Sequence, residues 1–128
     1  MDNGRAWRQG RRKTETTVQI QLVQRLRWLY PQYARLVFAI PNGGKRDKKT
    51  AMVLKNMGVL PGVPDLMVAV PKGEYHGCFI EMKRGPDGLL SRDQEEECLE
   101  LLGQGYRVII GEGLENSWEA VCGYLNQA

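Results

Sequence analysis

Two short apolar runs, separated by a segment of turn-forming residues, constrain the fold of this chain more than any other feature. The runs cover residues 65–70 (DLMVAV) and 78–83 (CFIEMK), and the segment between them reads PKGEYHG. Apolar runs of this length, joined by a connection that contains proline and glycine, predict two β-strands of an antiparallel hairpin. We expect this hairpin to be centred on Glu74.

The predicted hairpin gathers three charged side chains. Pairing about Glu74 would place Asp65 opposite Lys83, and Glu81 would lie one step away on the same face, because alternate side chains of a strand share a face. Carboxylates bind hard metal ions, and a lysine can steady or deprotonate an attacking water. Two carboxylates and an ammonium group in one small pocket therefore indicate a metal-dependent hydrolase.

Each of the three residues also has a purely structural interpretation. An aspartate after proline, such as Asp65, is common in turns, and Glu81 and Lys83 could pair across a solvated face of the sheet. A strand that is followed by a helical crossover tends, however, to be covered on both faces. The charges within residues 78–83 therefore favour a functional site over a solvated surface.

The composition argues against several classes of protein. The chain has 128 residues, of which 42% are hydrophobic, and this suits one domain with a modest core. No run approaches the roughly 18 apolar residues of a membrane span, and the start of the chain has no apolar signal region.

Three cysteines without a CxxC motif argue against a disulfide framework or a zinc site and suggest a reducing cytoplasm. A single histidine, His76, leaves no histidine pair for acid–base chemistry, and Ser91 has no acid–base partner that would indicate a serine hydrolase.

The net charge of +3 is unevenly distributed along the chain. Residues 1–13 carry five positive charges against one negative, residues 45–55 also carry five against one, and residues 92–100 hold five acids against Arg92. Two basic segments predict contact with a polyanion, although either one alone could equally be a solvated face. We interpret residues 1–13 as a flexible basic arm and residues 14–128 as a single domain.

An Asn-Gly-Gly sequence precedes the second basic segment. It could be merely a tight turn, or its backbone N–H groups could bind a phosphate beside neighbouring cationic side chains. The residues that the second interpretation involves are Asn42, Gly43, Gly44, Lys45, Arg46, Lys48 and Lys49. The segment is not a phosphate loop of the nucleotide-hydrolase type, because the G-x-x-x-x-G-K-[ST] pattern is absent.

Around the hairpin, apolar periodicity and boundary signals predict four helices and two more strands. We expect helices at 14–30, 46–57, 91–102 and 116–124, a buried strand at 36–40 and a further strand at 106–110. Strand 78–83, the helix that follows it and strand 106–110 form a βαβ unit, whose strands should be parallel with a right-handed crossover. The predicted fold class is therefore α/β, a small mixed β-sheet flanked by helices.

The helix at 14–30 carries two polar residues where apolar ones are expected. Its apolar stripe, extended backwards at helical spacing, reaches Gln19 and Glu15. Because a buried unpaired carboxylate is costly, either this turn projects past the core or Glu15 has a cationic partner. A metal ion would serve as that partner.

Two further helices bear on the site. In the helix at 91–102, Ser91 and Gln94 match a capping box, and Gln94 could equally point toward the sheet and the pocket. The basic helix at 46–57 is expected to turn its large apolar residues inward. These residues are Met52, Val53 and Met57.

These residues, in this order, resemble the virus-type replication-repair nuclease (VRR-NUC) family, a branch of the PD-(D/E)xK nuclease superfamily. The resemblance extends from about Glu15 to Tyr124 and includes FAIPNGGKR (38–46), LLSRDQ (89–94) and GYRVIIG (105–111). Its most specific part is GVPDLMVAVPKGEYHGCFIEMKR (62–84). In this part the core residues Asp65, Glu81 and Lys83 are intact.

The resemblance implies a restriction-endonuclease-like core and a divalent-metal-dependent phosphodiesterase. Mg²⁺ or Mn²⁺ would be held by Asp65, Glu81 and the backbone carbonyl of Met82, and Glu15 would contribute directly or through water. Lys83 would position the attacking water or stabilise the developing charge. Gln94 would be an accessory site residue. Gln19 and the basic residues from 42 to 49 would contact the nucleic acid.

The leading hypothesis is an endonuclease that hydrolyses DNA phosphodiester bonds and recognises DNA shape rather than sequence. Stand-alone members of the family are similar to homodimeric Holliday-junction resolvases. This suits the chemistry, because one pocket cuts one strand and a four-way junction needs two pockets related by a two-fold axis. The expected location is the cytoplasm of a bacterium or a phage-infected host cell. A monomeric nicking or flap nuclease, or a non-catalytic module that binds nucleic acid, are the alternatives.

Overall fold

The computed structural model describes residues 14–41, 47–83 and 88–128. The basic arm predicted at 1–13 lies outside these ranges, as do the proposed phosphate-binding residues Asn42, Gly43, Gly44, Lys45 and Arg46. Among the described residues, no helix is both long enough and apolar enough to cross a membrane.

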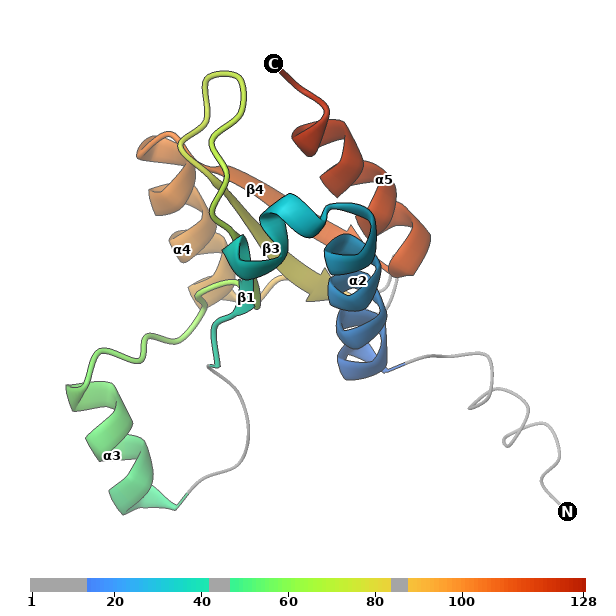
Figure 1. Ribbon diagram of the computed structural model, residues 1–128. Helices are drawn as coiled ribbons and strands as arrows, with labels where there is room; N and C mark the ends of the chain where they lie inside the picture. The colour runs from blue at the N-terminus through green and yellow to red at the C-terminus, as the bar shows by residue number, and fades with distance from the viewer. Residues whose placement is uncertain (1–13, 42–46, 84–87) are drawn as a thin grey trace, which may run out of the picture.

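A four-stranded mixed sheet forms the centre of the structure (Figure 1). In spatial order its strands are β1 (Val37–Ala39), β2 (Leu66–Val68), β3 (Cys78–Lys83) and β4 (Arg107–Glu112). Strand β2 pairs antiparallel with both β1 and β3, whereas β4 pairs parallel with β3. The predicted α/β class, the hairpin and the parallel βαβ unit are therefore confirmed.

Helices cover both faces of this sheet. Helices α2 (Glu15–Leu29) and α5 (Leu114–Leu125) lie on one face, and α4 (Arg92–Gly103) lies on the other (Figure 1). The main core is under α2 and α5, and its fully buried side chains include Leu22, Leu26, Leu66, Ile80 and Val121. Burial of each such aliphatic side chain favours the folded state by roughly 1.5–3 kcal/mol.

Capping residues and a glycine set the helix boundaries. Thr14 caps α2, and Pro31 ends it and begins a 3₁₀ helix, η1 (Pro31–Leu36). Helix α5 begins after Gly113, whose φ of 83° favours glycine. The predicted start at 116, with Asn116 as the cap, is wrong, because Asn116 lies in the first turn of α5 and its Oδ1 accepts a hydrogen bond from the Glu112 N–H at 2.9 Å.

Strand β1 is shorter and more exposed than predicted. Only Val37 is buried, and Phe38 is 42% exposed, because β1 is the edge strand and η1 takes up the residues before it. The guanidinium of Arg27 donates hydrogen bonds to the carbonyls of Val37 at 2.8 Å and Ala34 at 3.1 Å. This side chain therefore occupies part of the open edge of the sheet.

The register of the β2–β3 hairpin differs from the predicted one by two positions. Leu66 pairs with Ile80, so the same register continued by one residue places Asp65 opposite Glu81 and not opposite Lys83. A shift of two positions keeps every side chain on its predicted face. Asp65, Glu81 and Lys83 therefore still share one face of the sheet.

The turn has a pairing of its own. Lys72 and Tyr75 form an isolated bridge, in which Lys72 N–H donates to the Tyr75 carbonyl at 3.2 Å and Tyr75 N–H donates to the Lys72 carbonyl at 2.9 Å. Gly73 inside the bridge has a φ of 55°, which glycine adopts without strain. The bridge is centred between Gly73 and Glu74, whereas the β2–β3 pairs are centred on Gly73, so the segment between β2 and the bridge is one residue longer than the segment between the bridge and β3.

Helix α3 (Lys48–Asn56) overturns a second prediction. Asp47 caps it by accepting a hydrogen bond from the Thr50 N–H at 2.7 Å, so the helix itself forms as expected. None of its residues is buried, and Met52, Val53 and Met57 are 65%, 51% and 75% exposed. The prediction that these side chains turn inward is wrong, because α3 stands clear of the sheet and its flanking helices (Figure 1).

Candidate active site

Asp65 is anchored through both its backbone and its side chain. It follows the buried Pro64 at the end of the 60–64 loop, and its carbonyl accepts a hydrogen bond from the Ile40 N–H at 2.8 Å. Its Oδ2 accepts a second hydrogen bond, from the backbone N–H of Met82, at 2.7 Å. The half-buried carboxyl group is therefore bound directly to the strand that carries Glu81 and Lys83.

Glu81 is a buried carboxyl group without a cation in direct contact among the described residues. It is 4% exposed, and its side chain forms a hydrogen bond with Asp65. Burial raises the pKa of Glu81 to about 9, and the hydrogen bond and the negative charge of Asp65 act in the same direction. The positive charge of Lys83 opposes the rise, and the charge of Glu15 adds to it.

Lys83 is held by the first turn of α4. The side chain is 8% exposed, and its Nζ donates a hydrogen bond to Gln94 Oε1 at 3.0 Å. The same oxygen accepts the Ser91 N–H at 2.9 Å, while Ser91 Oγ accepts the Gln94 N–H at 3.2 Å, which completes the capping box. The two interpretations of Gln94 that the sequence left open are therefore both correct.

Cys98 is a neighbour of the site that the sequence analysis did not identify. It is buried on α4, and burial followed by the negative charge of Glu81 raises its pKa. The spacing between Gln94 and Cys98 could have indicated this position, because residues four apart lie on the same side of a helix. The pocket is thus enclosed between β3 and α4, on the sheet face opposite the main core.

The remaining predicted metal ligands are less closely assembled. Glu15 lies exposed in the first turn of α2, and its effect on the pKa of Glu81 is the smallest of the causes. Within the ranges that the structure describes, no group of three or more His, Cys, Asp or Glu residues is placed to hold an ion. The compact part of the site is the pair of Asp65 and Glu81, with the backbone of Met82 between Glu81 and Lys83.

The structure describes three of the predicted nucleic-acid contacts. Lys48 and Lys49 occupy the exposed first turn of α3, and Gln19 is half-buried one turn after Glu15 on α2. His76, the only histidine of the chain, is exposed.

The donor chemistry suits a hard divalent cation. The buried Glu81 and the half-buried Asp65 beside it supply oxygen ligands of the kind that Mg²⁺ and Mn²⁺ prefer. The adjacent Lys83 supplies a positive charge that would face an anionic substrate. The arrangement can therefore combine ion binding with stabilisation of negative charge.

Comparison with known proteins gives one informative result. No family model matches the chain, and no curated protein matches it. A solved structure described as a "VRR_NUC domain protein" superimposes with a TM-score of 0.80 and 24% sequence identity, and the match covers 91% of each chain. The two chains therefore share a fold, which confirms the expected architecture.

Proposed function

We propose that this chain is a divalent-metal-dependent endonuclease that hydrolyses DNA phosphodiester bonds. The observation that carries the proposal is the arrangement on β3, where the buried Glu81 and Lys83 lie two residues apart on one face and the N–H of Met82 between them donates to Asp65 Oδ2 at 2.7 Å. The fold shared with a protein described as a VRR_NUC domain protein supports the same chemistry.

Asp65, Glu81 and the Met82 carbonyl would hold Mg²⁺ or Mn²⁺, and Glu15 would contribute directly or through water. Such an ion polarises a phosphoryl oxygen and lowers the pKa of its bound water. The hydrogen bond from the Met82 N–H orients Asp65 Oδ2, and the proton that Glu81 carries would leave when a cation binds.

Lys83 orients the attacking water or balances the negative charge that develops at phosphorus. Gln94 is a positioning residue for this lysine, because its Oε1 accepts a hydrogen bond from Nζ at 3.0 Å. The capping box fixes the Gln94 side chain in turn. The lysine is therefore preorganised by α4 before a substrate binds.

Lys48, Lys49 and Gln19, with the residues at 1–13 and 42–46, would bind phosphates beyond the scissile bond. Contacts of this kind give an affinity that falls as salt rises and carry no sequence information. We propose a homodimer with two pockets related by a two-fold axis, which would act on branched DNA such as a four-way junction.

The test is cleavage of single-stranded, duplex, flap and four-way DNA by the purified protein with Mg²⁺ or Mn²⁺. Asp65→Ala and Lys83→Ala should abolish cleavage, and both variants should still bind junctions in Ca²⁺. Glu119→Ala changes an exposed acid on α5 and should cleave normally. Full activity in either site variant would refute the assignment.

A further inference from the structure

Helix α3 carries its positive charge along one side. Lys48, Met52 and Lys55 follow one another at intervals of four and three residues, so they lie on the same side of the helix, with Lys49 beside them. All four side chains are exposed, and the helix contains no acidic residue. This side of α3 therefore presents three ammonium groups around one exposed thioether.

These ammonium groups are not neutralised by neighbouring acids in the described part of the chain. Neither of the two ion pairs within residues 14–41, 47–83 and 88–128 involves a lysine. Asp47 precedes the helix, and its carboxylate already accepts the Thr50 N–H at 2.7 Å as the helix cap. A basic surface without compensating acids is typical of a protein that contacts a polyanion.

The connection to β2 keeps α3 within reach of the candidate active site. Asp65 directly precedes β2, and Figure 1 shows α3 beyond the end of the sheet that lies opposite the turn of the β2–β3 hairpin. The loop that leaves α3 packs on α4 at Gly62, where a Cβ would overlap the Asp93 carbonyl. Residues 58–64 can span at most about 30 Å, the length of roughly nine base pairs of duplex DNA. A contact made by α3 therefore falls within about one turn of DNA from the scissile bond.

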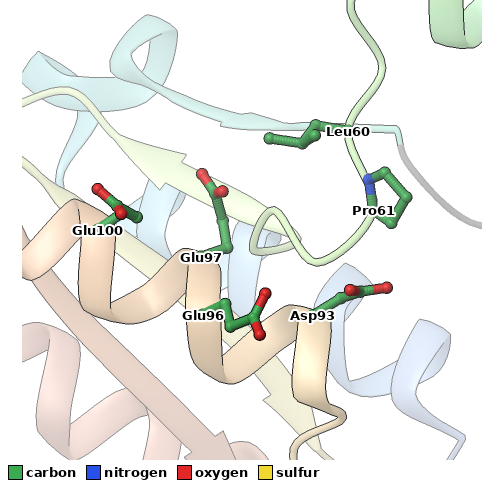
Figure 2. Close-up of a pocket in the computed structure, with 6 residues that line it drawn as sticks. All are labelled: Leu60, Pro61, Asp93, Glu96, Glu97 and Glu100. Atoms are coloured by element: carbon green, nitrogen blue, oxygen red, sulfur yellow. The ribbon is translucent and has the colours of Figure 1, made fainter.

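The neighbouring side of α4 has the opposite charge. Figure 2 shows a pocket between α4 and the loop after α3, and its lining residues are Leu60, Pro61, Asp93, Glu96, Glu97 and Glu100. Glu96 is paired with Arg92 at 3.1 Å, and the described residues that line the pocket include no Lys or Arg. DNA that extends from the active site is therefore repelled by this side of α4 and attracted by α3.

The chemistry of the basic side of α3 suits double-stranded DNA. Lys48 and Lys55 lie about 10 Å apart along the helix axis, and their flexible stems can reach phosphates on both sides of a major groove about 12 Å wide. A single strand is held in large part by stacking of its bases on aromatic rings. Helix α3 has no aromatic residue that could supply such a platform.

We propose that α3 binds a duplex arm of the DNA substrate beyond the scissile phosphate, with Lys48 and Lys55 on its phosphates and Lys49 beside them. The inference deepens the proposed function and rests on its DNA substrate, to which it adds a duplex that extends toward α3. A contact of this kind is equally strong before and during the reaction. It therefore lowers KM and leaves kcat unchanged.

The experiment measures binding in Ca²⁺ to the DNA that the wild type cleaves best, with each duplex arm shortened in turn from about 14 to about 5 base pairs. For the long-armed DNA, Lys48→Ala/Lys55→Ala should lower the affinity by about tenfold. It should also reduce the slope of log affinity against log salt by about two, because two phosphate contacts are lost. Shortening one particular arm should weaken the wild type by a similar factor and leave the double variant unchanged.

Two control variants separate this contact from other effects. Alanine favours a helix at least as well as lysine, so a loss of affinity would not come from unfolding of α3. Lys48→Arg/Lys55→Arg keeps both positive charges and should bind as the wild type does. Lys72→Ala removes a lysine from the hairpin turn and should leave the affinity unchanged.

Wild-type affinity and salt slope in the double alanine variant would overturn the inference alone. An equal loss of affinity for every arm length would also overturn it, because the contact would then lie at the cut. Loss of binding to anionic lipid vesicles, with unchanged affinity for DNA, would overturn it and assign α3 to a membrane surface. If the wild type binds DNA with the expected arm dependence but cleaves none, the proposed reaction fails and the contact of α3 stands.

Discussion

Asp65 Oδ2 accepts a hydrogen bond at 2.7 Å from the backbone N–H of Met82, the residue between Glu81 and Lys83. The side chain of Asp65, directly before β2, thus accepts a hydrogen bond from the backbone of β3 at a position beyond the last paired residues of the hairpin. The contact fixes the carboxyl group relative to both charged neighbours of Met82. It makes Asp65 part of the framework as well as of the proposed metal site.

Asp65→Asn separates these two roles. The amide oxygen can still accept the Met82 N–H, so we expect the melting temperature to fall by no more than a few degrees. Cleavage in Mg²⁺ should be lost, because a neutral amide is a poor ligand for a hard divalent ion. Thermal unfolding and cleavage of the same preparation test this, and retention of substantial cleavage would contradict the proposed ligand role.

The raised pKa of Glu81 predicts how stability depends on pH when no divalent ion is present. The folded state keeps a proton on this group up to a pKa of about 9, whereas the unfolded state releases it near the ordinary value of 4.5. The stabilisation is therefore complete below about pH 4.5 and is lost as pH rises toward 9. The melting temperature in EDTA should fall across this window by at least about 4 °C, the equivalent of roughly 1 kcal/mol in a domain of this size.

Glu81→Gln supplies the matched control for that measurement. The amide cannot ionise, so the slope of melting temperature against pH should flatten in EDTA. Mn²⁺ should stabilise the wild type more strongly at pH 8 than at pH 6, because ion and proton compete for the same oxygens. An equal slope in wild type and variant would show that Glu81 is not the group responsible.

Gln94→Ala should reduce cleavage by about 10- to 100-fold, the range observed when a residue that orients a site group is removed. The variant deletes the oxygen that Lys83 Nζ contacts at 3.0 Å. Ser91→Ala should cost about 1 kcal/mol of stability through loss of the helix cap, with a smaller effect on cleavage. If both variants lost equal stability and equal activity, Gln94 would act only through the capping box.

Gly62→Ala should destabilise the fold by about 1–3 kcal/mol and lower cleavage. Gly62 has a φ of 92°, and a Cβ there would overlap the Asp93 carbonyl, so the loop that leads to Asp65 would be forced off α4. Gly123→Ala is the matched control, since a Cβ at this exposed helical position meets nothing within 4 Å. It should stabilise by about 0.5–1 kcal/mol, and denaturant unfolding compares the two.

The sequence was sufficient for the features that depend on local patterns. Alternating and continuous apolar runs located the hairpin and the βαβ unit, and the spacing of Glu81 and Lys83 on one strand placed both on one face. The error in the predicted register did not change the site. The shift was two residues, and a shift by an even number of residues keeps each side chain on the same face of the sheet. The register itself depends on the connection between the strands, where one extra residue lies before the Lys72–Tyr75 bridge, and composition does not specify such an insertion.

Features that depend on tertiary contacts could not be predicted in the same way. The periodicity of α3 indicates an apolar side but not what covers it, so Met52, Val53 and Met57 were assigned to a core that they do not reach. Likewise, Gln94 matches a capping box from sequence alone, whereas its contact with Lys83 requires α4 to cross β3 at one particular height. The close approach of Gly62 to the Asp93 carbonyl on α4 likewise depends on tertiary packing, which the local sequence does not specify.

The short edge strand β1, with its Val37 carbonyl already bonded to Arg27, has a consequence for how copies of this protein can meet. An edge that offers so little free backbone is a poor template for an incoming strand. Growth of the sheet by strand addition is thereby disfavoured on the β1 side, where Arg27 takes the place that a foreign N–H would need.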